Sequence, residues 1–249
     1  MGEHGVSFSI TRQAAWAPGI ETPDAWQAWA QSPFVIAGDA EPSVRQMPSM
    51  LRRRAGFLGK LALEVAFQCL DGRTGVPAVF CSRHGEASRS VDLLTDLVND
   101  TALSPTGFGL AVHNASAGLF SIARADRANH MAVSAGASTV EHAVIEACSL
   151  LRDGAPEVLL VSYDICLPSV FQQFEECHEQ PHAWAWLVVP ADNNSMHLNW
   201  TAAQAETSEM PQTPNSMPGS LEVLQFQLRG DSQLQRSADR RLWSWTRDE

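Results

Sequence analysis

Two short segments resemble catalytic motifs in their residue types. Residues 178–182 (HEQPH) carry the histidine-glutamate-histidine pattern of zinc proteases, in which both histidines lie on one helical face and bind the metal. Pro181 argues against this interpretation, because a proline within a helix lacks the N–H that would bond the carbonyl of Cys177, at a cost of about 3 kcal/mol. We therefore expect no metal site in this segment.

The second segment, residues 136–140 (GASTV), is similar to the nucleophile elbow Gly-x-Ser-x-Gly, which would present Ser138 at a strand-to-helix turn. Val140 stands where the second glycine belongs, so the spacing fails. Cys148 lies in a segment of helical spacing, where a buried structural thiol is expected rather than a nucleophile. An acyl-transferring or acyl-hydrolysing enzyme that uses Ser138, Cys148 or His113 is kept as an alternative function.

The composition is that of a globular protein. Its 249 residues, 45% of them apolar, can form one substantial core or two small ones. The 17 Lys and Arg against 28 Asp and Glu give a net charge of −11, which argues against nucleic acid as the main ligand. No apolar run has the length of a signal peptide or a membrane-spanning helix. Five cysteines without a Cys-x-x-Cys pair are typical of reduced thiols. We expect a cytoplasmic protein and no cofactor.

Helices and strands alternate through the middle of the chain. Apolar residues at spacings of three and four predict helices over residues 49–70, 91–98, 112–122 and 140–151. Short apolar runs predict strands over residues 76–81, 131–134, 158–162 and 183–189. Strands separated by helices need crossover connections. We therefore expect an α/β fold with helices on both faces of a mixed, largely parallel sheet.

The composition changes after Pro190, which defines the expected domain organisation. Residues 1–190 form one domain, and residues 191–220, rich in Asn, Ser, Thr and Pro, form a polar loop or linker. Residues 221–249 begin with an alternating segment, LEVLQFQL, that predicts a strand, and continue as a helix-like tail. Trp243 and Trp245 need burial, so this tail is expected to dock back on the domain.

Four segments in order carry a family resemblance. They are residues 104–108 (SPTGF), 113–118 (HNASAG), 133–139 (VSAGAST) and 154–161 (GAPEVLLV). Their letters, order and spacing resemble the N-terminal half of a β-ketoacyl synthase of the thiolase fold, over about residues 49–189. The resemblance implies a thiolase-like layered fold that is truncated relative to a full ketosynthase.

Two departures from the family pattern bear on function. The family carries a cysteine nucleophile at a strand-to-helix turn, where the helix N-terminus favours the thiolate. The resemblance places Gly136 at this position, and glycine cannot form an acyl thioester. A complete ketosynthase also has a second half that supplies two histidines, whereas His178, His182 and His197 lie in no matching motif. The resemblance therefore assigns no catalytic residue to this chain.

An inert ketosynthase-like subunit resembles a chain length factor. A short chain with the segment WSWTR near its C-terminus, at residues 243–247, is similar to the chain-length-factor-type proteins of bacterial aryl polyene pathways. The resemblance implies a heterodimer with a full-length β-ketoacyl synthase, in which this subunit shapes the acyl tunnel during polyene or polyketide elongation. Acyl carrier proteins are acidic, so we expect them to bind mainly the partner. A stand-alone acyl-chain-binding module, with residues 192–220 as its lid, is a further alternative.

The same resemblance places the tunnel and the dimer interface by position. The expected tunnel and interface residues are Gly107, Phe108, Ala111, Val112, His113, Asn114, Asn129, Met131, Val133 and Ser134. Residues 129–134 would form the strand that pairs with the partner. Phe108 is expected either as the wall of the tunnel or as a core residue, while Gly107 and Ala111 leave room. His113 is expected to be a hydrogen-bonded helix residue rather than a ligand.

Overall fold

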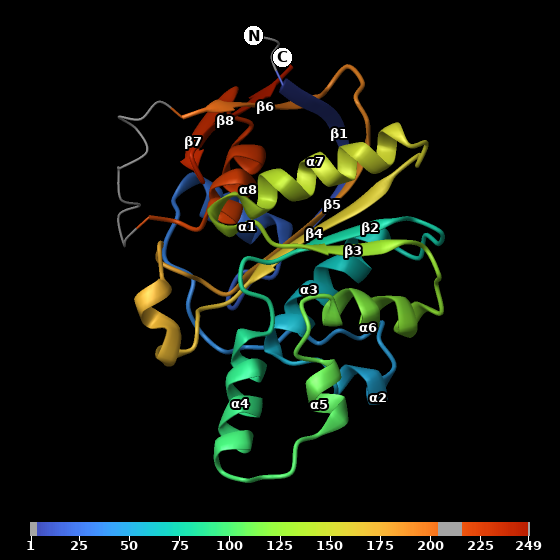
Figure 1. Ribbon diagram of the computed structural model, residues 1–249. Coiled ribbons are helices and arrows are strands. Elements are labelled where there is room, and N and C mark those ends of the chain that lie inside the picture. Colours follow the sequence, from blue (N-terminus) through green and yellow to red (C-terminus); the bar gives the residue numbers. More distant parts are fainter. Residues whose placement is uncertain (1–3, 204–215, 249) are drawn as a thin grey trace.

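A mixed sheet organises the computed structural model, which describes residues 4–203 and 216–248 (Figure 1). Its strands are β1 (His4–Trp16), β2 (Ala78–Cys81), β3 (His130–Val133), β4 (Val158–Asp164), β5 (His182–Pro190), β6 (Met196–Ala202), β7 (Gln233–Ala238) and β8 (Arg241–Arg247). Their order across the sheet is β3-β2-β4-β5-β1-β6-β8-β7. Only β2 makes parallel pairs, with β3 and β4, and the remaining pairs are antiparallel. The parallel share is smaller than predicted because β5 follows β4 through a loop that reverses the chain.

Helices cover both faces of the sheet. They are α1 (Pro23–Gln31), α2 (Ser49–Arg52), α3 (Phe57–Leu70), α4 (Ala87–Val98), α5 (Pro105–Gly109), α6 (Ala115–Arg124), α7 (Thr139–Arg152) and α8 (Gly219–Arg229), with 3-10 turns η1 (Gly136–Ser138) and η2 (Ser169–Phe174). Helices α3 and α6 lie on one face and α7 on the other (Figure 1). The single helix predicted over residues 49–70 is two helices, α2 and α3, separated near Gly56.

Two hydrophobic cores lie on either side of the central strands. In β5, Trp184 and Trp186 face the core of α7 and α8, whereas Ala183, Ala185 and Leu187 face the core of α3 and α6. A strand buried on both faces has no polar side to show to water. This explains the continuous apolar runs at residues 78–81, 158–161 and 183–189 within β2, β4 and β5.

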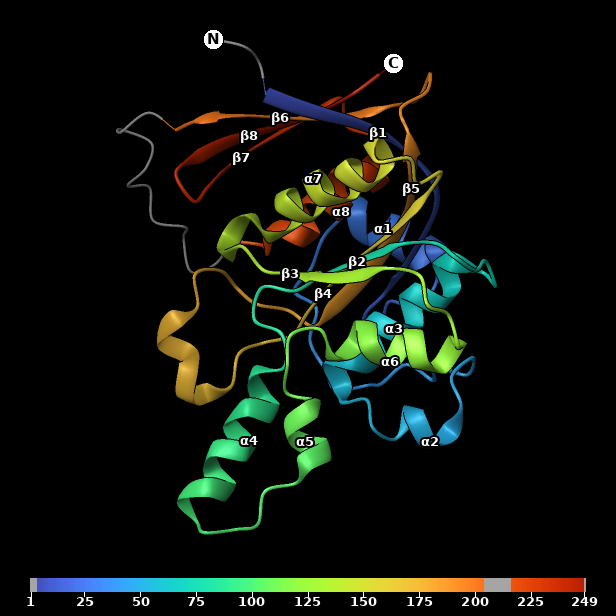
Figure 2. The same ribbon diagram turned by 45° about the vertical axis from the view of Figure 1, so that its right-hand side comes forward.

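The C-terminal strands curl over α7. Figure 2 shows β6, β8 and β7 above α7, and β2, β3 and β4 below it. Trp243 and Trp245 of β8 belong to the core around α7, and the Trp243 ring stands 5.3 Å from that of His142. Both tryptophans are thus buried, as predicted. The tail that carries them is the β7–β8 hairpin, so the predicted helix-like tail is wrong.

Two further predictions for the C-terminal region are corrected. Residues 221–228 lie in helix α8 and not in a strand. The helix begins after Pro218 and ends at Gly230, which adopts a left-handed conformation (φ +70°). The alternating pattern fits a helix as well, since Leu221 and Leu224 lie on one buried face. Part of the predicted linker forms strand β6, and residues 204–215 lie outside the described part. No helix in the described ranges has the length and apolar character that a membrane crossing requires.

Candidate functional site

The carboxyl ends of the parallel strands β2, β3 and β4 meet at one pocket. In α/β sheets, ligands bind beyond the carboxyl ends of the strands. The pocket has a volume of about 330 Å³, and its lining includes Gly136, Asp164, Glu179, His182 and Arg236. It lies at the strand-to-helix turn between β3 and α7, the turn that sequence reasoning singled out.

Gly136 adopts a left-handed conformation at this turn, with a φ of +57°. The turn is closed by Thr139, whose Oγ1 accepts a hydrogen bond from the N–H of Ala135 at 2.9 Å and donates to the carbonyl of Gly136 at 2.8 Å. Helix α7 then begins at Thr139. The chain thus presents a glycine backbone, without a side chain, at the start of a 14-residue helix.

Asp239 of the β7–β8 turn reaches the start of α7. Its Oδ2 accepts from the N–H of Ser138 at 2.8 Å and from Ser138 Oγ at 2.5 Å. A carboxylate at this place satisfies an otherwise unpaired amide and interacts favourably with the helix dipole. Asp239 and Arg240 both have positive φ, +51° and +61°, so the tight turn aims this carboxylate at α7. Sequence reasoning missed Asp239 because it lies 101 residues after Ser138.

A buried ion-pair network lies next to Asp239 on β7. Arg236 donates from Nη1 to Glu141 of α7, from Nε to Glu222 of α8 at 2.6 Å, and from Nη2 to the carbonyl of Ala137 at 3.3 Å. Glu141 has no exposed surface, and Arg236 is 8% exposed. The guanidinium neutralises a carboxylate that could not be buried alone. The network ties β7 to both α7 and α8.

The metalloprotease-like segment at residues 178–182 lacks the helix that would place both histidines on one face. Residues 178–181 are not helical, and His182 is the first residue of β5. The ring nitrogens of His182 bond the carbonyl of Gln180 at 2.7 Å and Ser220 Oγ at 2.6 Å. Glu179 bonds His84 Nε2 at 2.7 Å. The described residues contain no group of three His, Cys, Asp or Glu side chains arranged to hold a metal ion.

Burial moves two pKa values at the pocket in opposite directions. It raises the pKa of Asp164 from 3.8 to about 6, although Ser82 Oγ and the Arg83 N–H donate to this carboxylate. Burial lowers the pKa of His182 from 6.5 to about 4. Each shift corresponds to roughly 3 kcal/mol in the free energy of unfolding. As the pH falls, the Asp164 shift raises this free energy and the His182 shift lowers it.

The Asp164→Asn variant should lose more stability in acid than the parent protein. As the pH falls from 6.5 to 4, the unfolded chain protonates His182 before the native chain does, which lowers the free energy of unfolding. Over much of this range native Asp164 takes up a proton before the unfolded chain does, which offsets that loss. The variant lacks the offset, so it should lose about 2 kcal/mol more between these two pH values. Urea denaturation measures the difference, and the same pH dependence in both proteins would contradict the assignment.

Ser138, Cys148 and His113, the residues of the alternative enzyme, do not form an accessible pair of a nucleophile and a base. Ser138 is fully buried, and its hydroxyl lies between Asp239 and the carbonyl of Ala135. Cys148 is buried within α7, and burial raises the pKa of its thiol to about 12. His113 lies in the turn before α6, with Nε2 3.4 Å from the carbonyl of Val133, so it is hydrogen-bonded as expected but precedes the helix.

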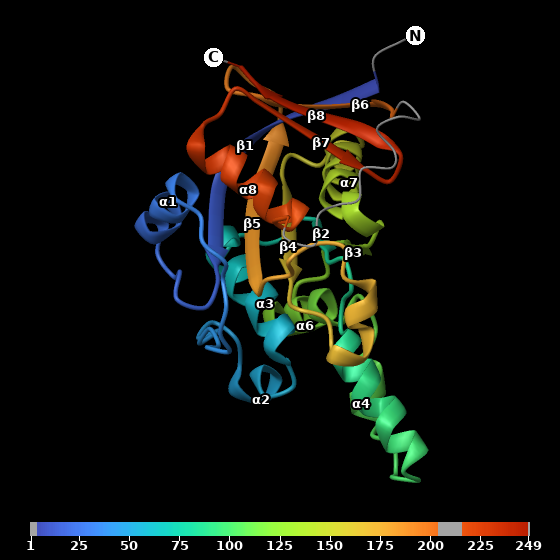
Figure 3. The same cartoon turned by 90° about the vertical axis from the view of Figure 1, so that its left-hand side faces the viewer.

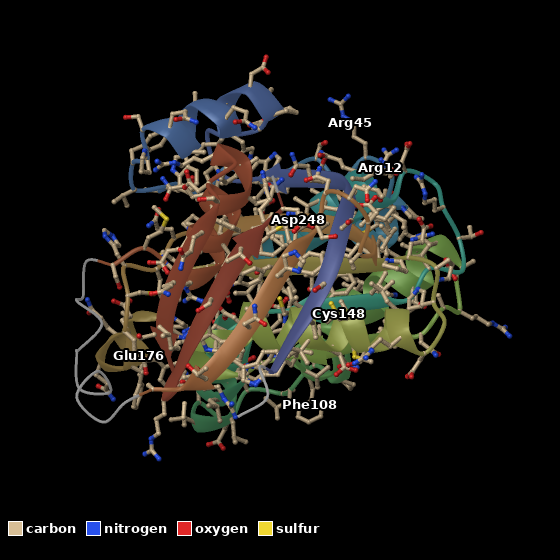
Figure 4. The ribbon with its side chains drawn as sticks, turned by 90° about the horizontal axis from the view of Figure 1, so that it is seen from above. Arg12, Arg45, Phe108, Cys148, Glu176 and Asp248 are labelled. Carbon is tan, nitrogen blue, oxygen red and sulfur yellow. The ribbon has the colours of Figure 1, made fainter. Side chains whose placement is uncertain are left out.

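The residues expected at a tunnel or interface lie in two parts of the fold, the segment from α5 to the start of α6 and the strand β3. Helices α4 and α5 form an arm that extends away from the sheet (Figure 2), and α4 stands out from the body of the molecule in Figure 3. Gly107 and Phe108 are on α5, and the residues 111–114 form the turn that leads into α6. Phe108 is 66% exposed and lies at the rim of the molecule, whereas Cys148 lies inside its outline (Figure 4). Phe108 is therefore not a core residue of this chain.

Strand β3 carries the other expected interface residues at the edge of the sheet. It pairs with β2 on one side, and no other described strand lies on its outer side. Asn129 accepts from the N–H of Ala78 just before the strand, and Ser134 Oγ donates to the carbonyl of Arg83 just after it. Met131 and Val133 are partly buried and pack against the core of α7.

Comparison with known proteins identifies the family. Residues 26–246 match the family described as β-ketoacyl synthase, N-terminal domain. The chain belongs to this family. A search of curated proteins gives no match.

Solved ketosynthase structures share the fold. A chain in the structure of the ketosynthase ApeO in complex with its chain length factor ApeC, from Xenorhabdus doucetiae, is 27% identical, with a TM-score of 0.83 over 97% of this chain and 99% of that chain. The ishigamide ketosynthase/chain length factor is 16% identical, with a TM-score of 0.58 over 79% and 67%. A type II polyketide synthase complex of an acyl carrier protein with its ketosynthase, AntDE:AntF, is 10% identical, with a TM-score of 0.67 over 99% and 99%. The predicted thiolase-like ketosynthase fold is confirmed, and the chain resembles a chain-length-factor type of ketosynthase domain.

Proposed function

We propose that this protein is the chain length factor of a heterodimeric β-ketoacyl synthase. It pairs with an active β-ketoacyl-ACP synthase, performs no acyl transfer itself, and shapes the acyl tunnel during polyene or polyketide elongation. The observation that carries the proposal is the strand-to-helix turn, where Gly136 stands at the position at which the family resemblance expects a nucleophile. The likeness to a chain of a ketosynthase and chain length factor complex, over nearly all of both chains, supports the same assignment.

The surface of the chain is consistent with such a partner. Strand β3 offers a sheet edge for pairing, and an edge strand with free N–H and C=O groups readily accepts a strand from another chain. The arm formed by α4 and α5 also presents apolar side chains to solvent. We expect the two together to bury on the order of 2,000 Å² with the partner, the size of an obligate interface.

The two alternative functions have weaker support. An acyl-transferring or acyl-hydrolysing enzyme needs an accessible nucleophile, and Ser138 and Cys148 are both buried. A stand-alone acyl-chain-binding module needs an apolar cavity, but the pocket at Gly136 contains Asp164, Glu179 and Arg236. The lid assigned to that module falls partly on β6 and partly outside the described residues.

The acidic balance of the chain and its C-terminal sequence extend the proposal. The net charge of −11 disfavours direct binding of an acidic acyl carrier protein, so the carrier protein should engage the heterodimer mainly through the partner. The similarity of residues 243–247 (WSWTR) to proteins of aryl polyene pathways supports a role in polyene synthesis, and five cysteines without a Cys-x-x-Cys pair are consistent with the reducing cytoplasm.

Co-expression with a full-length ketosynthase of the same organism tests this proposal. We expect a one-to-one heterodimer by size exclusion with light scattering, and poor solubility of the chain alone. After incubation with an acyl thioester, mass spectrometry should find the acyl group on the partner and not on this chain. A soluble monomer that forms no complex would overturn the heterodimer, and an acyl adduct on the isolated chain would instead favour the enzyme.

A further inference from the structure

Asp239 occupies the place into which a side chain at position 136 would project. A Cβ atom built on Gly136 would lie 3.1 Å from Asp239 Oδ1 and 3.4 Å from Oδ2. The same carboxylate holds the N–H and the hydroxyl of Ser138 at the start of α7. The N-terminus of this helix is therefore already occupied by an anion that belongs to the chain itself.

We propose that Asp239 disfavours a reactive thiolate at this turn, in addition to the absence of a cysteine at position 136. A cysteine introduced at position 136 would therefore not by itself restore a reactive thiolate. Asp239 acts as a positioning residue: it fixes the turn and directs its negative charge at the site. The inference rests on the proposed function for its meaning, because that proposal assigns the lost nucleophile to position 136. The thiol measurement below does not depend on the partner.

Electrostatics give the expected direction. A negative charge within a few ångströms disfavours a second one, while a free helix N-terminus favours it. Arg236 is the nearest cation in the network, but its donors are engaged by Glu141, Glu222 and the carbonyl of Ala137. The other charged or titratable groups around the turn are Arg240 and Arg241 directly after Asp239, His142 on α7, Arg83 and His84 after β2, Asp164 on β4, Glu222 on α8, Glu179 before β5 and His182 at its start. Ser138 donates both of its hydrogen bonds to Oδ2 of Asp239, and Oδ1 is the atom that lies nearest to the Cβ position of residue 136.

The test compares two introduced cysteines in a chain whose exposed native cysteine is removed by Cys166→Ser. One variant carries Gly136→Cys alone, and the other adds Asp239→Asn, which keeps the shape and removes the charge. Iodoacetamide labelling followed by intact mass across pH 6 to 10, roughly spanning the ordinary thiol pKa of about 8.5, gives the pKa of each thiol. We expect the single variant to titrate above the ordinary value and Asp239→Asn to raise its labelling rate at neutral pH about tenfold. The control Asp231→Asn removes a carboxylate that pairs with Arg229, and it should leave the rate unchanged.

Equal pKa values for the cysteine with and without Asp239→Asn would overturn the inference, and so would a thiol in the single variant that titrates below the ordinary value. Gly136→Cys places a side chain at positive φ, so a second measurement uses the native glycine. Hydrogen exchange of the segment 135–139 should become faster in Asp239→Ala, which removes the acceptor, than in Asp239→Asn. Unchanged exchange in Asp239→Ala would also overturn it. Loss of the heterodimer in co-expression would instead count against the proposed function alone.

Discussion

Replacement of Leu94 by glutamate should abolish the complex with the ketosynthase while the chain keeps its own fold. Leu94, Leu97 and Val98 lie at spacings of three and four on α4, and their side chains are 56%, 58% and 82% exposed. No residue of α4 is buried in this chain, and the helix extends away from the sheet (Figure 3). An apolar helix face of this kind is expected to be covered by a partner.

The expected loss is large because the substitution places a charge in an apolar interface. An unpaired charge that becomes buried on binding costs at least about 3 kcal/mol, which weakens the Kd roughly 100-fold. The free energy of unfolding of the isolated chain should change little, since Leu94 faces solvent there, and its solubility should rise. Co-purification and surface plasmon resonance measure the complex, and urea denaturation checks the fold.

Val35→Glu is the matched control for this experiment. Val35 is 51% exposed, and it follows α1, which packs on α8 rather than on the arm of α4 and α5. This variant carries the same charge change on a similarly exposed apolar side chain and should bind the ketosynthase normally. The assignment of the interface fails if Leu94→Glu binds as tightly as the parent chain, or if Val35→Glu is the variant that loses the partner.

The central layers of the fold could be predicted from local patterns. The stripe of Val140, Val144, Ala147 and Leu151 predicts helix α7, and all four side chains are buried. The apolar runs at residues 78–81, 158–161 and 183–189 predict β2, β4 and β5, because both faces of these segments are covered and neither face needs polar side chains. For these elements, the local sequence alone indicates both the secondary structure and which side chains are buried.

Other elements depend on contacts that are distant in sequence. Strand β1 is stabilised by pairing with β5 and β6, and its regular register is interrupted between Ile10 and Arg12. The same holds for Asp239, which caps the start of α7 through hydrogen bonds from Ser138, a residue far away in the chain. A local pattern contains no information about such a partner. The family resemblance identified the turn at Gly136, but the group that closes it required the fold.

Replacement of Phe108 by alanine should lengthen the acyl product of the heterodimer. Phe108 is 66% exposed on α5, beside the apolar face of α4, so its ring is free to project into the partner. If it forms the end of the acyl tunnel, a smaller side chain lets the growing chain pass through further elongation steps before it meets a wall. Ala111→Phe, in the turn after α5, should have the opposite effect and shorten the product.

Product length rather than yield is the decisive quantity for this prediction. The heterodimer is supplied with acyl carrier protein and malonyl units, and mass spectrometry of the carrier-bound chains gives their distribution. Phe34→Ala is the control, because Phe34 is 59% exposed but lies in the loop after α1 rather than on the arm. Opposite shifts for Phe108→Ala and Ala111→Phe, with no shift for Phe34→Ala, would support a wall at α5. An unchanged product in Phe108→Ala, with the complex intact, would assign the end of the tunnel to another residue.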